Sequence, residues 1–535
     1  MSGIGRRNDQ YSTYGSILNS LQRTCQPSRN RYEAASEAPE NISTANGANM
    51  SNPPAGLADQ LKKSTSALQL SRDLREGKIS AREVMSDTYA RINAINPQVN
   101  ALVNLLTEDQ ADHLATIADQ IPIAERGPLH AIPMAPKDAV EVKGFPTTWG
   151  FVPYANNIAS TDDAQASRLR KAGAIFIGHS NMPEFGLGSH TFNNLFGSTL
   201  NPYDLDKTPG GSSGGAAVAL ATSMLPLADG SDMGGSLRNP ASFCNVVGFR
   251  PSIGRVPAGR AMPWFGRLST TGPMAKTVAD ATLLFAVQAG PDQNDPLTLP
   301  ESGDHFLDAL MPPEHLNGYR IAYSPDLYGL PIEPEVATII CAAADVMSNL
   351  GAAVEHNAPD LRQAMSVFQT QRAAGLAILG NTLDRNLPDW RSHAKDTAVW
   401  NIEKGQALCA TDILQSEITR GQIYARVADF FSNYDALILP AAQVTPFSID
   451  IDWIREINGM PMTTYIDWMT ICCAITVTGL PAISVPAGFT SAGLPVGLQI
   501  VGKPRGDLDL LKLAHTFERA TQFGLRQPEI DPSKL

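Results

Sequence analysis

The sequence has few cysteines, a deficit of positive charge and no uninterrupted apolar run long enough to span a membrane. Its six cysteines form no C-x-x-C pair and no group with histidine, so neither a zinc site nor a disulfide framework is predicted. A formal net charge of −12 leaves no basic surface for nucleic acid or anionic lipid. We therefore expect free thiols, a cytoplasmic location, no metal or other cofactor, and a small neutral substrate.

Two segments differ from the rest of the chain: a long uncharged tract near the C-terminus and a polar N-terminal stretch. The uncharged tract 468–502 is interrupted by three prolines and several glycines, so we predict buried strands of a central sheet at 482–485 and 496–501 instead of a membrane span. The N-terminal residues are rich in Ser, Asn and Arg and contain no signal-peptide apolar core. Residues 1–56 are predicted to be a disordered extension, and residues 57–535 a single catalytic domain.

The remaining sequence predicts an α/β fold. Helical spacing over 68–95, broken at 77–80, indicates two helices joined by a turn, with Ser80 and Glu83 as a capping box and Asn96-Pro97 as the end. Beyond residue 131, short apolar runs such as 174–178 alternate with helical patterns such as 167–172. A chain that is 43% hydrophobic and 535 residues long can bury a large core.

Two glycine clusters that carry serines, 210–215 and 230–238, are the most informative part of the sequence. Neither continues into the Gly-Lys-Ser or Gly-Lys-Thr of a phosphate loop. Glycine allows backbone N–H groups to crowd a substrate carbonyl, and serine supplies an attacking or proton-relaying hydroxyl. The clusters therefore predict an acyl-transfer site.

Ser236 is the candidate nucleophile. It follows a predicted strand at 224–228 and precedes the helix-like segment 237–240. This placement predicts an oxyanion hole in which the N–H groups of neighbouring residues converge near a helix N-terminus; these residues are Met233, Gly234, Gly235 and Ser236. A simple glycine turn with a capping serine is the structural alternative.

Lysine is the candidate base because no histidine lies in either cluster and the nine histidines show no motif spacing. A G-x-S-x-G pattern occurs at 210–214, but the residues before it do not form a predicted strand, which disfavours a nucleophile elbow. Lys137 lies in the apolar, proline-stiffened segment 132–139. Burial there would lower its pKa and allow it to accept a proton, whereas an exposed lysine beside Asp138 would remain charged.

Lys137, Ser212 and Ser236, together with the motifs around them, resemble the amidase signature family of Ser-cisSer-Lys hydrolases. The resemblance extends over about 68–289, including the motifs at 207–215 and 243–251, and resumes over 478–499. It implies an α/β fold of α/β/α layers around a large mixed β-sheet, with a helical N-terminal arm.

The resemblance also implies the role of each site residue. Ser236 would attack the carbonyl, Ser212 would pass on its proton, and neutral Lys137 would be the base; water would then cleave the acyl-enzyme. Ser212 is expected to follow a cis peptide bond from Gly211. The remaining loop residues are expected to support the site, Ser213 through a hydrogen bond, and Asp232 and Arg238 through an ion pair or hydrogen bond.

Departures from the family concern the substrate more than the reaction. Pro136 replaces a usual β-branched residue, and Trp-Gly-Phe at 149–151 replaces small residues. These bulky residues would either wall the carbonyl site or pack in the core. The least similar section is 296–426, whose larger side chains present the same two alternatives; they include Met365, Phe368, Trp390 and Trp400.

Three functions are consistent with the sequence. The first is a stand-alone hydrolase of small amides, by a route that would also serve carbamates, anilides or esters. The second is the glutaminase-like subunit of a tRNA-dependent amidotransferase, which requires a partner. The third is a non-catalytic scaffold, which the intact Lys137, Ser212 and Ser236 disfavour. We favour the first, with a small-molecule partner only; homodimer formation is left open.

Overall fold

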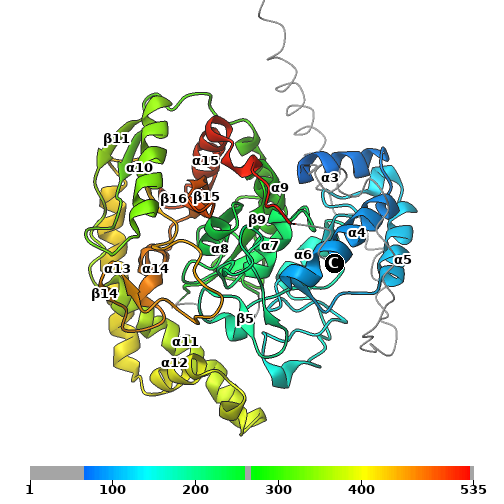
Figure 1. The fold of residues 1–535 in the computed structure, drawn as a ribbon, viewed down its shortest axis with the longest axis horizontal. Helices are drawn as coiled ribbons and strands as arrows, with labels where there is room; N and C mark the ends of the chain where they lie inside the picture. The colour runs from blue at the N-terminus through cyan, green and yellow to red at the C-terminus, as the bar shows by residue number, and fades with distance from the viewer. Residues whose placement is uncertain (1–65, 260–266, 531–535) are drawn as a thin grey trace, which may run out of the picture.

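A mixed eight-stranded sheet forms the centre of the molecule. The computed structural model describes residues 66–259 and 267–530, so the predicted disordered extension, 1–56, lies outside the described residues. The sheet has the strand order β11-β10-β12-β16-β15-β8-β9-β7. Figure 1 shows α3, α4 and α5 at one end of the molecule and α10 and α13 at the other, with the sheet between them.

The strands of the main sheet are short except for two in its middle. Their bounds are β7 Ala228–Asp232, β8 Val247–Arg250, β9 Thr270–Ala275, β10 Arg320–Tyr323, β11 Ala353–His356, β12 Ala436–Pro440, β15 Ala482–Phe489 and β16 Pro495–Gly502. β10 pairs in parallel with β11 and β12, and all other pairs are antiparallel. β15 and β16 confirm the strands predicted in the uncharged tract, which is apolar because both faces are covered.

Pairs of two-residue strands accompany the main sheet in the described ranges. These short strands are β1 Leu102–Val103, β2 Pro133–Met134, β3 Ile175–Phe176, β4 His179–Ser180, β5 Phe192–Asn193, β6 Gly197–Ser198, β13 Glu456–Ile457 and β14 Met460–Pro461. The predicted apolar run at 174–178 thus contains β3, which pairs in parallel with β2.

Helices cover both faces of the sheet. Their bounds are α3 Ala67–Glu76, α4 Ala81–Val99, α5 Glu108–Asp119, α6 Ala164–Lys171, α7 Gly214–Ala221, α8 Arg238–Phe243, α9 Val278–Gln288, α10 Pro334–Asn349, α11 Ala364–Asn386, α12 Asp396–Gln406, α13 Ala410–Phe430, α14 Thr470–Thr478 and α15 Asp507–Thr521. Short 3₁₀ helices are η2 Ile123–Glu125, η3 Val152–Tyr154, η4 Glu184–Gly186, η5 Gly303–Leu310, η6 Trp390–Ser392, η7 Asp467–Met469 and η8 Phe523–Leu525.

Two glycines of β16 show how the layers are arranged. A Cβ on Gly497 would lie 2.8 Å from the Cβ of Ser242 in α8, and a Cβ on Gly502 would lie 3.1 Å from the Cβ of Leu510 in α15. Positions five residues apart in a strand face opposite sides of the sheet. α8 and α15 therefore cover opposite faces, and the α/β/α layering is confirmed. None of the helices in the described ranges combines the length and apolar character that crossing a membrane requires.

The N-terminal arm confirms the predicted helix pair, with one correction. Ser80 and Glu83 form the predicted capping box at the start of α4. The predicted end at Asn96-Pro97 is wrong, because α4 continues through Pro97 to Val99. In the last turn the missing N–H of proline removes only one helical bond, and the N–H of Asn100 still donates to the Asn96 carbonyl at 2.8 Å.

The strand before Ser236 begins later than predicted. The sequence predicts it at 224–228, whereas β7 is Ala228–Asp232. Two features explain the difference: Leu225 donates its N–H to Ala219 at the end of α7, and Pro226 has no N–H for a sheet ladder. The apolar residues at 224–227 are a buried connection. The strand therefore includes the start of the second glycine cluster.

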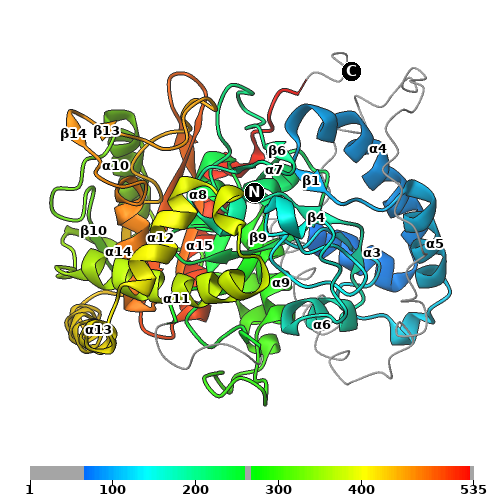
Figure 2. The same cartoon turned by 90° about the horizontal axis from the view of Figure 1, so that it is seen from below.

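Residues 296–426, the section expected to resemble the family least, are mainly helical. Seen from below in Figure 2, α11, α12 and α13 lie toward the end of the molecule opposite α5. A separate small apolar cluster joins Phe151, Phe185 and Trp390, and the rings of Phe151 and Phe185 are 4.7 Å apart. Phe151 and Trp390 are thus core residues, whereas Trp149 and Trp400 are each 38% exposed.

Candidate active site

Lys137 is held by the main chain on both sides and is almost completely buried. It follows β2 and forms a parallel bridge with Ser180, whose N–H donates to the Pro136 carbonyl at 2.9 Å. Directly after it, the chain turns, and the N–H of Val140 donates to the Lys137 carbonyl at 2.8 Å. Only 2% of the lysine is exposed. The alternative of a solvated charge beside Asp138 is therefore wrong.

Asp138 has its own partners. Its carboxylate accepts from the N–H of Thr148 at 2.9 Å and from the Thr148 hydroxyl. Burial raises the pKa of Asp138 to about 6, and the bonds from Thr148 oppose that rise. The carboxylate holds the turn at 148–150 and does not contact the lysine amine.

Three serine hydroxyls surround the Lys137 Nζ. The distances are 2.7 Å to Ser212 Oγ, 3.1 Å to Ser213 Oγ and 3.1 Å to Ser231 Oγ. A charged amine would donate to all three oxygens, whereas a neutral amine would donate to two and accept from the third. Since hydroxyls can rotate, the same shell satisfies both forms. Sequence analysis did not select Ser231, although it lies inside the second glycine cluster.

The protonation state of Lys137 follows from its burial. Burial lowers its pKa from 10.5 to about 7, and the carboxylates of Asp229 and Asp232 oppose this decrease only in part. Near neutral pH, a substantial fraction of the amine is therefore uncharged. An uncharged amine with one hydroxyl 2.7 Å away can accept a proton from that hydroxyl.

The first glycine cluster presents Ser212 to the lysine. The Gly211–Ser212 peptide bond is cis, as the resemblance implies. Ser189 holds this peptide from one side: its hydroxyl accepts from the Gly211 N–H at 3.1 Å and donates to the Gly211 carbonyl at 2.7 Å. The Thr191 hydroxyl likewise donates to the Gly210 carbonyl at 2.8 Å. Sequence analysis did not identify Ser189 or Thr191, because no pattern links a distant serine to this loop.

Ser236 lies in the turn between β7 and α8, as predicted, and is partly exposed. Its carbonyl accepts from the Ser213 N–H at 3.3 Å, which joins this turn to the cis-peptide loop. Gly230, the first residue of the second cluster, packs against the first cluster: a Cβ on it would be 2.6 Å from the Ser213 oxygen. A close approach of the two loops thus requires glycine at this position.

The four N–H groups predicted to form an oxyanion hole are not equivalent. That of Gly235 donates to the Asp232 carboxylate at 2.8 Å. Within the described residues, the N–H groups of Met233, Gly234 and Ser236 donate to no carbonyl or carboxylate, so they are available to a substrate. Gly234 faces Phe368 of α11, which lies 3.1 Å from the position of a Cβ on that glycine. Phe368 is thus a core residue that also contacts the turn.

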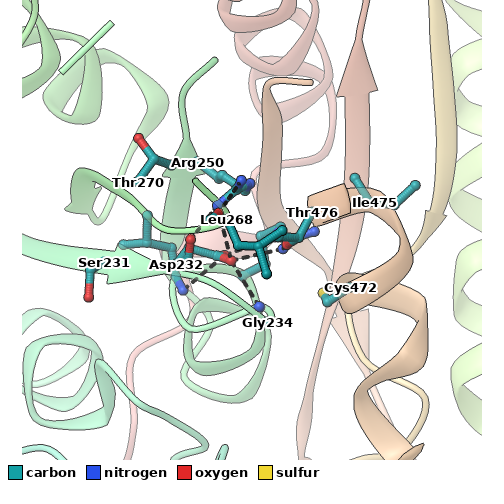
Figure 3. A network of polar contacts seen from close by, with 12 residues as sticks. Ser231, Asp232, Gly234, Arg250, Leu268, Thr270, Cys472, Ile475 and Thr476 are labelled. Atoms are coloured by element: carbon teal, nitrogen blue, oxygen red, sulfur yellow. Dashed lines mark hydrogen bonds and ion pairs between the residues drawn. The ribbon is translucent and has the colours of Figure 1, made fainter. Parts of the chain in front are cut away.

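Asp232 and Arg238 form the predicted ion pair, and a second arginine joins it. Both carboxylate oxygens lie 2.9 Å from Arg238 nitrogens, and one lies 3.7 Å from Arg250 Nη1. Figure 3 shows this network reaching from β7 to α14, where Thr476 accepts from Arg238 at 2.9 Å. Burial alone would raise the pKa of Asp232, but the two arginines lower it below its usual range.

Histidine and metal-ligand groups are not assembled near these serines. The three most buried histidines of the described residues contact no serine of the site: a ring nitrogen of His179 and one of His190 are hydrogen-bonded to main-chain carbonyls, and His130 Nε2 has no partner. Burial lowers the pKa of His179 and of His190 to about 4. No three His, Cys, Asp or Glu side chains of residues 66–259 and 267–530 are grouped to hold a metal ion. The five described cysteines are free thiols.

Comparison with known proteins gives the family. A family model described as Amidase matches residues 83–511. The chain belongs to the amidase signature family. An acylamidase of Rhodococcus erythropolis is 33% identical over 472 residues, which cover 86% of this chain and 97% of that relative. This amidase signature protein is thus a hydrolase of a family that acts on amides.

Two further relatives of this amidase signature hydrolase are informative. The A subunit of the glutamyl-tRNA(Gln) amidotransferase of Geobacillus thermodenitrificans (strain NG80-2) is 33% identical over 479 residues, covering 85% of this chain and 97% of the relative. The solved structure of a bacterial aryl acylamidase has a TM-score of 0.80 at 29% identity and covers 86% of this chain and 97% of that chain. The fold prediction is confirmed, while the two relatives correspond to different predicted functions.

Proposed function

We propose that the protein is a serine amidohydrolase that cleaves the C–N bond of small amides through an acyl-enzyme on Ser236. The observation that carries the proposal is the buried Lys137 amine 2.7 Å from Ser212 Oγ, beside a turn that carries a partly exposed serine. A buried lysine without a carboxylate at its amine is poised to act as a base.

In the proposed reaction, Ser236 Oγ forms a bond to the substrate carbonyl carbon while its proton passes to Ser212, and the Ser212 proton passes to the lone pair of Lys137 Nζ. The developing oxyanion accepts from the N–H groups of the turn at 233–236 that Asp232 does not occupy, those of Met233, Gly234 and Ser236. The C–N bond then breaks, and the amine leaves with the proton returned by Lys137 through Ser212. Water attacks the resulting ester by the same proton path, which releases the acid and frees Ser236.

The acylamidase relatives support an aryl or acyl amide as the substrate. Carbamates, anilides and esters belong to the same proposal, because each offers a carbonyl and a leaving group to one acyl-enzyme route. The net charge of −12 supports a small-molecule partner without nucleic acid or membrane, and free buried thiols support a cytoplasmic location.

The alternative function is the glutaminase-like subunit of an amidotransferase, which the Geobacillus relative supports at equal identity. It differs from the first proposal in substrate and in partner. Glutamine would be cleaved, and a second protein would be needed for full activity.

A substrate panel tests both proposals. Release of amine or alcohol is measured for aryl amides, aryl carbamates, aryl esters and glutamine, with wild type and Ser236→Ala in parallel. We expect cleavage of aryl amides by the single chain and loss of that activity in Ser236→Ala. Cleavage of glutamine alone would favour the amidotransferase function. Undiminished turnover by Ser236→Ala would refute the assigned nucleophile, and loss of activity in EDTA would refute the prediction of a metal-free enzyme.

A further inference from the structure

Asp229 is a buried carboxylate in direct contact with Lys137 that the reaction described above does not use. Its Oδ1 accepts from the Lys137 main-chain N–H at 3.3 Å. Its Oδ2 is buried and has no hydrogen-bond partner among the described residues. Leaving a buried carboxylate oxygen unpaired costs free energy, so a compensating role is expected.

The geometry of β7 explains why Asp229 and the lysine amine belong together. Side chains two residues apart on a strand share one face, so Asp229 and Ser231 point to the same side of β7. Asp229 contacts the main chain of Lys137, and Ser231 contacts its Nζ at 3.1 Å. The lysine thus lies along this face of the strand, held at its two ends.

Of the two carboxylates near Lys137, only Asp229 is not already paired with an arginine, so it can balance a positive charge on the lysine. The carboxylates whose charges raise the pKa of the lysine are Asp229 and Asp232. Asp232 forms ion pairs with Arg238 and Arg250 on the other face of the strand. Three serine hydroxyls, all neutral, complete the surroundings of the amine.

Among the described residues, the charged groups that most affect the Asp229 carboxylate are Lys137 and a further carboxylate, Asp163, which caps the N-terminus of α6. Burial and the nearby Asp163 carboxylate raise the pKa of Asp229 to about 7, and the bond from Lys137 opposes the rise. Each of the two groups therefore affects the protonation of the other, since Asp229 raises the pKa of Lys137 and Lys137 lowers that of Asp229.

We propose that Asp229 is a positioning residue of the amidase centre: it anchors the main chain of Lys137 and supplies the buried negative charge that balances the lysine when it takes up the proton. This inference rests on the proposed function. During acylation, the proton of Ser236 reaches Lys137 through Ser212, and the negative charge of Asp229, held at the lysine main chain, then stabilises the ammonium ion through the buried interior. Without that charge, the ammonium ion is harder to form.

The test is the pH dependence of two reactions in Asp229→Asn and in Asp229→Ser, a second neutral variant in case the first does not fold. One reaction is aryl amide cleavage. The other is inactivation by phenylmethylsulfonyl fluoride, in which Ser236 Oγ bonds to sulfur, the S–F bond breaks, fluoride leaves and the lysine takes the proton. Mass spectrometry identifies the modified residue, so nucleophile activation is measured without turnover.

We expect the acidic limb of both profiles to move to lower pH, by about one unit, because an opposite charge nearby normally raises a lysine pKa by about one to three units. The matched control is Asp280→Asn, which removes a carboxylate that is 2% exposed and whose bonds go to Ser66 and Leu68. In Asp280→Asn, the acidic limb of both pH–rate profiles should stay at the pH of wild type.

Each outcome decides the inference. A limb that stays in place in a folded Asp229 variant, or that moves equally in Asp280→Asn, overturns the inference while leaving the proposed function intact. Absence of both amide cleavage and Ser236 labelling in wild type overturns the proposed function, and the inference with it.

Discussion

Two buried charge clusters on opposite faces of β7 are balanced in different ways. On one face, the Asp232 carboxylate lies against Arg238 and Arg250, so opposite charges meet directly. On the other face, the Lys137 amine meets only hydroxyls, and Asp229 reaches the main chain of the lysine and not its amine. Figure 3 shows Ser231, from the second face, pointing away from the Asp232 network.

The difference separates a structural cluster from a reactive one. In the first cluster, burial would lower the pKa of Arg238, but the contact with Asp232 raises it above its usual range. Burial lowers the pKa of the third member, Arg250, to about 10, so all three groups keep their charges near neutral pH. In the second cluster, burial brings the pKa of Lys137 to about 7 and that of Asp229 to about 7, so both can exchange protons under mild conditions. The five residues of β7 thus carry the carboxylate that fixes the turn on one face, and contact the adaptable base Lys137 on the other.

The largest effect that would distinguish the clusters is expected from Lys137→Met. Loss of the base should lower the rate of aryl amide cleavage by about 10²–10⁴-fold. The free energy of unfolding should not fall, because methionine fills the space of the lysine stem and removes the cost of burying an amine. Steady-state kinetics and urea unfolding measure the two quantities.

The control for this variant is Lys171→Met, which changes an exposed lysine at the end of α6. It should keep the wild-type rate. A Lys137→Met enzyme with wild-type kinetics would show that Lys137 is not the base and would remove the contrast between the two clusters.

Asp232→Asn should have the opposite consequence, a loss of stability. The variant leaves Arg238 and Arg250, both fully buried, without their carboxylate. Removing one partner of a buried ion pair costs about 3–5 kcal/mol, which urea unfolding would detect. Glu355→Gln is the matched control, since Glu355 and Arg320 pair on the surface with side chains that are 46% and 47% exposed. A comparable loss in both variants would contradict the special role of the buried cluster.

The sequence predicts the contacts of these clusters only where the partners are close together in the chain. Asp232 and Arg238 are six residues apart on either side of a glycine turn, so local proximity was enough to predict their pairing. Arg250 joins them from β8, and Thr476 joins from α14. Those contacts depend on sheet order and helix packing, which no local pattern contains.

The reactive cluster shows the same limit more clearly. Sequence patterns alone indicate Ser236 and Lys137 as candidates, the family resemblance adds Ser212 and the role of each, and neither indicates Ser189 or Ser231. The sequence could have predicted Ser231 as a site residue: with the strand placed at Ala228–Asp232, the alternation of side chains puts Asp229 and Ser231 on one face. The prediction failed because the apolar residues 224–227 suggested an earlier strand, while Pro226 excludes them from a ladder.

The pH dependence of stability provides a sharper comparison. The folded pKa of Lys137 is about 7 and its ordinary value is 10.5, so between these values the unfolded chain binds more protons at this residue. The unfolding free energy of wild type, relative to Lys137→Met, should therefore rise with pH across this window by about 1.4 kcal/mol per pH unit.

The carboxylate of the structural cluster affects stability in the same direction, but in a lower pH range. Its folded pKa is lowered from 3.8, so the stability that Asp232 contributes is present above that value and is lost as pH falls further. Urea titrations from about pH 6 to about pH 10 should therefore show the lysine effect without interference from Asp232. A difference between wild type and Lys137→Met that stays constant over this range would mean that the lysine is not desolvated in the folded protein.

The smallest effect concerns the two hydroxyls that accompany Ser212 at the lysine amine. Ser213→Ala and Ser231→Ala each remove one hydrogen bond, at 3.1 Å in both cases, and leave the 2.7 Å contact with Ser212 intact. A single such bond contributes about 1 kcal/mol, so each variant should lose roughly fivefold in kcat/KM. Ser212→Ala removes the relay itself and should lose far more. Equal losses in all three variants would mean that the amine uses the hydroxyls interchangeably, and the order Ser236, Ser212, Lys137 would no longer describe the proton path.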